Sequence, residues 1–141
     1  MHRQVGSELV IGDDGLVTRG LIIRHLILPN DVAGSRATLA FIAKELGTRV
    51  TLSVMAQYYP TTKITDENAL RNSALMLLNR GIREREYHAV LALLDEFGFE
   101  NGWVQEFEAE RYYRPDFTDR AEPFKDRLDF HPVAITISGD L

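Results

Sequence analysis

The sequence predicts a mixed α/β protein built around a parallel sheet. Aliphatic runs at 21–28 and 50–56 are typical of strands, and a third strand is expected at 103–107. Amphipathic helices are predicted between them, at 35–46 and 83–97. Strands that alternate with helices form parallel crossover units, so the chain contains either a small open sheet or part of a (β/α) barrel. A complete eightfold barrel takes about 250 residues, more than the 141 available.

Size and composition indicate one soluble globular domain. The chain has 45% hydrophobic and 26% charged residues, and its net charge of -5 argues against a nucleic-acid surface. No apolar run approaches the roughly 20 residues that cross a bilayer, and the first residues do not resemble a signal peptide. A cytoplasmic location without membrane contact is therefore expected.

The chain contains no cysteine. Disulfides, thiolate zinc sites, cysteine nucleophiles and an iron–sulfur cluster held by this chain alone are thereby excluded. No two histidines have the spacing that places two ligands on one helix face. A metal site is not expected.

The segment before the first long strand is predicted to be a β-hairpin. Residues 8–11 and 16–18 are rich in strand formers, and the turn between them contains Asp-Gly. This combination is a strong local signal for a hairpin.

The run 21–28 is expected to be the central strand. Six of its eight residues are large aliphatics, so both faces are apolar and burial on both sides is predicted. Pro29 ends the strand because it lacks a backbone donor, and Asn30 and Asp31 then turn the chain.

Two polar residues interrupt this strand. Arg24 suits a carboxylate or phosphate ligand, but an ion pair with Glu45 or Asp31 is an equal alternative. His25 can serve as an acid, a base or a ligand, although a hydrogen-bonded core role is favoured for a lone histidine in an apolar strand.

The helix at 35–46 is predicted to begin at a Ser35 cap, and the strand at 50–56 follows it. Gln57 and Tyr58 come directly after that strand, on the same rim of the sheet as the end of the first strand. They are either ligand-binding groups or part of a turn packed by aromatic rings.

The remaining elements are less regular. A helix capped by Thr65 is expected to end at Gly81, and Arg80 near its end either reaches the same rim or is solvated. Residues from 108 onward are expected to form a surface tail, with an edge strand at 133–137.

Five short motifs then occur together in order. They are MHRQVG at 1–6, GLIIRHLILP at 20–29, VMAQYYP at 54–60, LNR at 78–80 and NGWVQE at 101–106. Together they resemble the C-terminal half of radical S-adenosylmethionine proteins related to pyruvate formate-lyase activating enzyme. The resemblance covers nearly all of residues 1–120, and 121–141 are expected to be a C-terminal tail.

The resemblance implies a partial (β/α) barrel in which 21–28 is like the fifth strand and 50–55 like the sixth. In that family a CxxxCxxC loop holds a [4Fe-4S] cluster that binds S-adenosylmethionine. Reductive cleavage gives a 5′-deoxyadenosyl radical, which acts on a glycyl residue of a partner protein. The resemblance places Arg24 and Leu28 near the adenosyl moiety, and Gln57 and Tyr58 where the activating enzymes have a histidine near the cofactor.

The chain also departs from the family pattern. The cysteine loop and the first four strands are missing, Asn30 replaces a usual glycine, and Ile82-Arg83 replace a threonine-type helix cap. Met1 corresponds to the interior of a helix in the family. A truncated form, a split-gene product or an internal start is therefore expected.

Three functional hypotheses follow. The first is an enzyme fragment that is not catalytic alone and binds no cofactor alone. The second is a non-catalytic binding or assembly module on the same half-barrel, and the third is an unrelated small α/β domain. Because truncation exposes a strand edge at 20–29, self-association through that edge or through the hairpin is also predicted.

Overall fold

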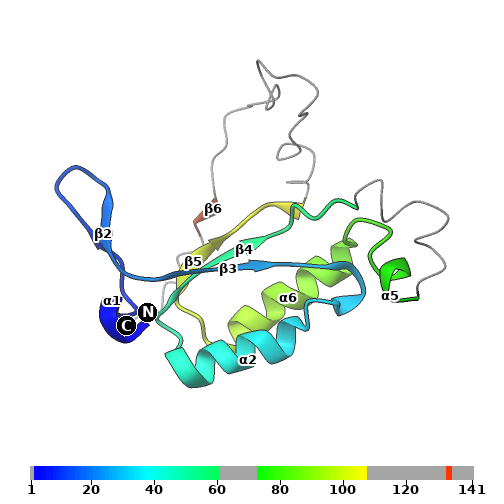
Figure 1. Cartoon of the computed structure of the whole chain (residues 1–141), viewed down its shortest axis with the longest axis horizontal. Coiled ribbons are helices and arrows are strands. Elements are labelled where there is room, and N and C mark those ends of the chain that lie inside the picture. Colours follow the sequence, from blue (N-terminus) through cyan, green and yellow to red (C-terminus); the bar gives the residue numbers. More distant parts are fainter. Residues whose placement is uncertain (1, 61–72, 108–132, 135–141) are drawn as a thin grey trace, which may run out of the picture.

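A four-stranded sheet is the centre of the fold (Figure 1). The structure is a computed structural model that describes residues 2–60, 73–107 and 133–134. The strand order is β3-β4-β5-β6, with β3 (Ile22–Leu26), β4 (Thr51–Met55) and β5 (Asn101–Val104) parallel and β6 (Val133–Ala134) antiparallel to β5. The predicted α/β class with three parallel strands is confirmed. Within the described residues the sheet does not close, so the partial barrel stays a prediction.

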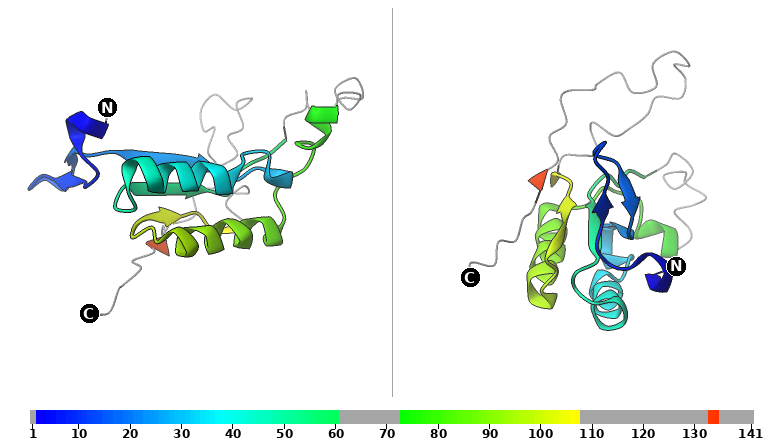
Figure 2. Two further views of the ribbon diagram at one scale, coloured as in Figure 1. Left: turned by 90° about the horizontal axis from the view of Figure 1, so that it is seen from below. Right: turned by 90° about the vertical axis from the view of Figure 1, so that its left-hand side faces the viewer.

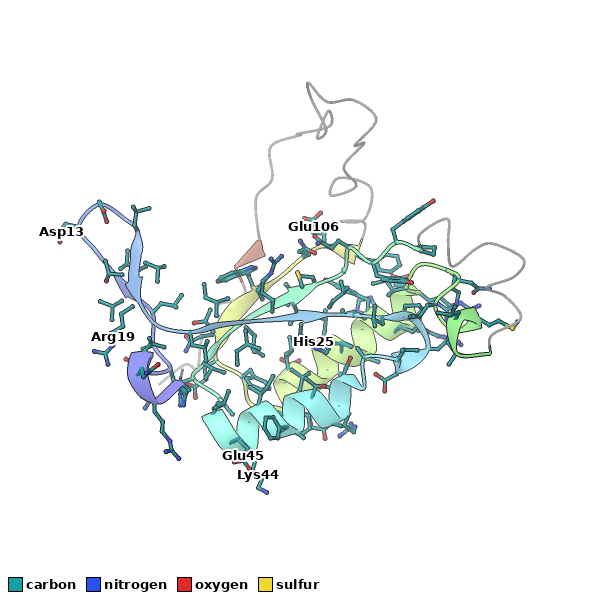
Figure 3. All side chains as sticks on the ribbon, in the orientation of Figure 1. Asp13, Arg19, His25, Lys44, Glu45 and Glu106 are labelled. Carbon is teal, nitrogen blue, oxygen red and sulfur yellow. The ribbon has the colours of Figure 1, made fainter. Side chains whose placement is uncertain are left out.

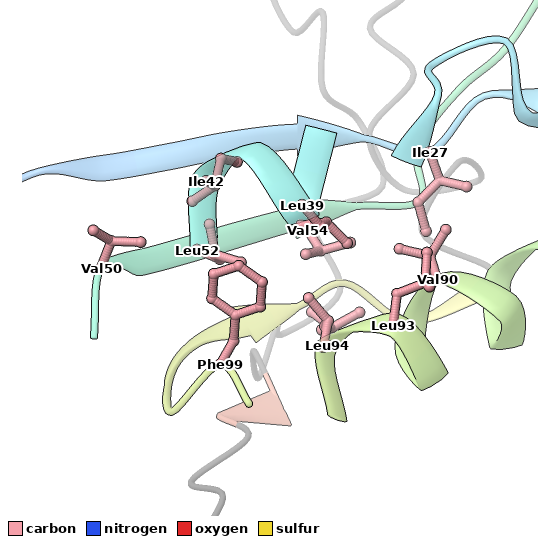
Figure 4. Close-up of a cluster of buried hydrophobic side chains, with 11 residues drawn as sticks. Ile27, Leu39, Ile42, Val50, Leu52, Val54, Val90, Leu93, Leu94 and Phe99 are labelled. Atoms are coloured by element: carbon pink, nitrogen blue, oxygen red, sulfur yellow. The ribbon is translucent and has the colours of Figure 1, made fainter. Parts of the chain in front are cut away.

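Two helices cover one face of this sheet. The helix α2 (Ser35–Leu46) links β3 to β4, and α6 (Glu84–Phe97) precedes β5. Figure 2 shows both helices on the same side of the strands. Buried side chains from the sheet and both helices fill the space between them (Figure 4); they include Ile27, Leu39, Ile42, Val50, Leu52, Val54, Val90, Leu93, Leu94, Phe99 and Val104.

The strand β3 lies at the edge of the described sheet. One of its two faces is exposed, contrary to the prediction that both are buried. His25 and Ile27 are buried on the side of the helices, whereas Ile22 is 39% exposed and Arg24 is exposed on the other side. The aliphatic run predicted two covered faces, but among the described residues helices cover only one. On this second face Arg24 is exposed, whereas Ser53 of the neighbouring β4 is buried.

The predicted hairpin is confirmed. It consists of β1 (Val10–Ile11) and β2 (Val17–Arg19), which pair antiparallel, and the Gly12 N–H donates to the Leu16 carbonyl at 2.8 Å. The hairpin projects beyond the amino-terminal end of β3 (Figure 1). At its base, the Arg19 side chain donates to a carbonyl of the short helix α1 (His2–Val5). The base of the hairpin is thus tethered to α1, and Glu8 at its start forms an ion pair with Arg49 at 3.2 Å.

The start of α2 differs from the prediction. Ser35 is the first helical residue and is not the cap, because Gly34 precedes it in a left-handed conformation with φ 58°. The Asp31 carboxylate accepts the Ser35 N–H at 2.9 Å and satisfies one of the unpaired amides of the first turn. The Ser35 hydroxyl does not cap the helix and instead lies 2.9 Å from His25 Nε2.

The third parallel strand lies two residues earlier than predicted. The strand β5 begins at Asn101, and Gly102 adopts φ 148° within it. A Cβ at Gly102 would collide with the Leu52 carbonyl oxygen of β4. Asn-Gly is typical of a turn, but here the glycine allows two strand backbones to approach closely.

The other predicted elements are described only in part. The predicted helix at 83–97 is confirmed as α6, and β6 confirms an edge strand at 133–134. The helix capped by Thr65 lies largely outside the described residues, of which α5 (Ser73–Met76) is a single turn. The tail at 108–132 and residues 135–137 also lie outside them. Within the described segments, no helix is long and apolar enough to cross a membrane.

Candidate functional site on the open face of the sheet

The side of the sheet away from α2 and α6 gathers side chains from all three parallel strands. Arg24 of β3, Ser53 of β4 and Trp103 of β5 are in register and therefore lie in one row. Met55 and Gln57 continue this side of β4 toward its carboxyl end. We call the surface formed by Arg24, Ser53, Met55, Gln57 and Trp103 the open face. Both long helices lie on the opposite side (Figure 2).

Arg24 is the cation of the open face. Its side chain is exposed and its Nη2 lies 2.8 Å from the Met55 sulfur, a weak acceptor. The alternative of an ion pair with Glu45 or Asp31 is not observed, because Glu45 pairs with Lys44 and the Asp31 carboxylate accepts from a helix amide. Among the described residues no carboxylate forms an ion pair with Arg24. Its guanidinium can therefore bind a ligand.

Two glutamine side chains form an amide pair at the carboxyl end of the open face. The buried Gln105 accepts the Ala56 N–H at 3.1 Å and donates to the Gln57 Oε1 at 3.0 Å. The Tyr87 hydroxyl fixes the backbone by donating to the Gln105 carbonyl. The oxygen of Gln57 is thus used, whereas its amide nitrogen has no acceptor among the described residues. Gln57 therefore presents a neutral hydrogen-bond donor.

The other two predicted cofactor residues do not share this arrangement. The Tyr58 hydroxyl donates to the Leu78 carbonyl at 2.7 Å, and burial raises the pKa of Tyr58. Leu28 lines a depression between α2 and α6 together with Ala89 and Leu93. The structure thus places Arg24 and Gln57 on the same side of the sheet and gives Tyr58 a structural contact.

A carboxylate network, which was not predicted, fixes the loop after β3. Glu86 accepts two bonds from the Arg80 guanidinium at 2.7 and 2.8 Å and one from the Asn30 backbone N–H at 2.8 Å. Arg80 also donates to the Asn30 side chain, and Asn30 donates to the Leu77 carbonyl. The hydrogen bonds from Arg80 lower the pKa of Glu86 to about 2. Arg80 therefore does reach this rim, as part of a structural ion pair.

This network includes two positions at which the chain differs from the family that it resembles in sequence. Asn30 has φ 57°, a left-handed conformation that asparagine tolerates better than most residues other than glycine. Glu86 accepts the N–H of the cap residue Arg83 at 2.8 Å, which is the glutamate half of a capping box. Two sequence features are consistent with this network: Asn-Asp directly after Pro29, and a glutamate at the third position of the helix α6.

His25 belongs to the core, as favoured from the sequence. It lies on the helix side of β3 (Figure 3), where its Nε2 is 2.9 Å from the Ser35 hydroxyl. Burial lowers the pKa of His25, and the nearby Asp31 carboxylate partly opposes this effect. His25 holds β3 against α2 and takes no part in the open face.

The described residues of the open face offer hydrogen-bond donors to an organic ligand and no set of metal ligands. In the described ranges there is no group of three or more potential metal ligands, and the chain has no cysteine. The [4Fe-4S] cluster implied by the resemblance therefore does not fit this chain. S-adenosylmethionine fits in part, because Arg24, Gln57 and the Trp103 ring offer donors beside an aromatic surface.

Searches of protein-family models, curated proteins and solved structures found no match to this chain.

Proposed function

We propose that this chain is the C-terminal part of a radical S-adenosylmethionine protein related to glycyl-radical activating enzymes. One observation gives the main support: β3, β4 and β5 are parallel and sequential, with both helices on one face. In a (β/α) barrel the helices lie outside and the inner face and strand ends hold the ligand. A doubly wound sheet has helices on both faces and a point where strand order reverses, and neither occurs in the described sheet.

The open face then forms one wall of the cofactor site. Arg24 would contact the adenosyl group, because a guanidinium both donates hydrogen bonds and stacks on aromatic rings. Gln57 would donate its amide N–H to the same ligand, while Tyr58 keeps the loop after β4 in place. A cysteine-bearing segment must hold the cluster, so this chain alone does not cleave S-adenosylmethionine. The proposed protein substrate is of the glycyl-radical type.

The test is a ligand titration followed by backbone and side-chain NMR. S-adenosylmethionine and 5′-deoxyadenosine at roughly millimolar concentration are expected to shift the Arg24 and Gln57 signals, with weak affinity because only one wall is present. Arg24→Ala should abolish these shifts. Arg85→Ala is the control, because Arg85 is exposed on α6, on the other side of the sheet. No shift on the open face, or equal shifts in both variants, would contradict the proposal.

The alternative is a non-catalytic binding or assembly module built on the same scaffold. The outer edge of β3 favours it, because within the described residues this edge has no partner strand and a free strand edge can bind another chain. A module of this kind would bind a protein partner and show no response to either adenosyl ligand at the open face.

A further inference from the structure

A hollow on the helix side of β5 lies beside Gly102. In the register of β4 with β5, Gly102 is opposite Leu52, which belongs to the core between the sheet and the helices (Figure 4). Glycine places no side chain on that side. Apolar side chains of β4, α6 and the turn before β5 line the hollow, among them Leu52, Leu94 and Phe99. Its volume of about 280 Å³ is many times what one water molecule needs, so it can hold whole side chains.

A side chain cannot fill this hollow from position 102 itself. A Cβ at Gly102, which has φ 148°, would collide with the Leu52 carbonyl oxygen. The strand β6 pairs with the outer edge of β5 at Trp103 and Val104. Within the described residues no strand pairs with this edge at Asn101 or Gly102. An apolar group that fills the hollow would therefore come from a neighbour along this edge.

The register of β6 with β5 directs the chain along this edge. The two strands are antiparallel, and Ala134 lies opposite Trp103. If this register continues, each further residue moves one position back along β5, so position 135 falls opposite Gly102 and position 137 opposite Glu100. Opposite residues share one side of the sheet, and neighbouring residues alternate between the two sides. Positions 135 and 137 then belong to the helix side, and position 136 belongs to the other side.

The sequence from 133 to 138, VAITIS, has the pattern that this register requires. The positions on the helix side hold Val, Ile and Ile, whereas the positions on the other side hold Ala, Thr and Ser. β-Branched residues favour strands and pack well against a half-buried surface. A large side chain opposite a strand glycine also covers the backbone that the glycine leaves open. Isoleucine at 135 and 137 therefore suits both the strand and the hollow.

We propose that Ile135 and Ile137 of this chain fill the hollow, with β6 continuing along β5 as far as Glu100. Residues 135–137 lie outside the described residues, and the sequence pattern alone predicts an edge strand there without its neighbour. The register of β6, the gap at Gly102 and the apolar lining together assign its partner strand and its buried side. The hollow is then an internal surface of the chain and is closed to a protein partner. Neither isoleucine takes part in the proposed function, so the two hypotheses can fail separately.

Paired cysteines in the full chain test the register, since the chain contains no other cysteine. Asn101→Cys and Thr136→Cys together would place two thiols at opposite positions, where Cα atoms about 4.5–5.5 Å apart suit a disulfide. Asn101→Cys with Asp140→Cys is the control, because its second thiol lies further along the same tail. Under mild oxidant the first pair should form an intramolecular disulfide at least about tenfold faster than the control. Equal rates would overturn the proposal, as would a first-pair disulfide that links two copies, because a second copy would then supply the strand.

Binding of an apolar dye tests whether the isoleucines fill the hollow. In the full chain, Ile135→Ser with Ile137→Ser should raise the fluorescence of 8-anilinonaphthalene-1-sulfonate at least about twofold, because an opened apolar hollow binds the dye. The Tm should also fall by at least about 4 °C, while circular dichroism shows a folded chain. Thr136→Ser is the matched control and should change neither quantity, because position 136 belongs to the other side of the sheet. The proposal is wrong if the wild type binds as much dye as the double variant, or if Thr136→Ser has the same effect.

Discussion

Replacing Glu86 by glutamine tests whether the carboxylate network holds the loop after β3. Each Glu86 oxygen accepts one bond from Arg80 and one backbone N–H, from Asn30 at Oε1 and from Arg83 at Oε2. Glutamine keeps one oxygen and replaces the other with an NH₂ group, which would face two donors. Two charge-assisted bonds are therefore lost, and the Arg80 cation is left without its carboxylate.

The size of the effect follows from the pKa of Glu86. Its fall from 4.5 to about 2 corresponds to about 3 kcal/mol of preference for the ionised folded state. The side chain is 15% exposed, so solvent screening reduces the expected loss of unfolding free energy to about 2 kcal/mol. For a chain of this size that is a decrease in Tm of about 4–8 °C.

The effect must also depend on pH. Because the pKa of Glu86 is lower in the folded state, its contribution is complete above the unfolded value of 4.5 and is lost as pH falls toward 2. Urea unfolding followed by circular dichroism should show a Glu86→Gln deficit at pH 7 that shrinks by pH 3. Glu84→Gln is the control, because Glu84 carries the same charge in the same helix but is 75% exposed. The reasoning is refuted if both variants are equally stable at pH 7, or if the Glu86→Gln deficit does not change with pH.

Three further predictions concern the sheet and the core, and urea unfolding measures each of them. Gly102→Ala should lose at least about 2 kcal/mol, since its Cβ meets the Leu52 carbonyl at φ 148°; a near-neutral result would contradict the close strand approach. Burial lowers the pKa of His25, so stability should fall as pH drops below 6.5 and His25→Gln should reduce this slope; an unchanged slope would exclude His25 as its source. Leu39→Ala, at a fully buried position, should lose about 2–5 kcal/mol, and a loss as small as that of a surface variant would contradict the packing described.

The order of elements could be predicted because it depends on local patterns. The apolar stripe of α2, the Asp-Gly turn of the hairpin and the aliphatic runs of β3 and β4 each specify an element within a few residues. The burial of β3 could not be predicted in the same way, because a strand with two apolar faces does not indicate how many of them helices will cover. The start of β5 was predicted two residues too late, because the Asn-Gly sequence occurs in turns and also where two strands approach closely.

The candidate site could be predicted only where the alternation of side chains along a strand determines which face a residue occupies. Side chains alternate along a strand, so the register of β3 with β4 predicts that Arg24 and Gln57 share one side of the sheet. The pairing of Arg80 and Glu86 with Asn30 is different, because Glu86 contacts a backbone amide 56 residues away. No local pattern specifies such a contact. The one local sequence feature of this network is the position of Glu86, three residues after the helix cap Arg83.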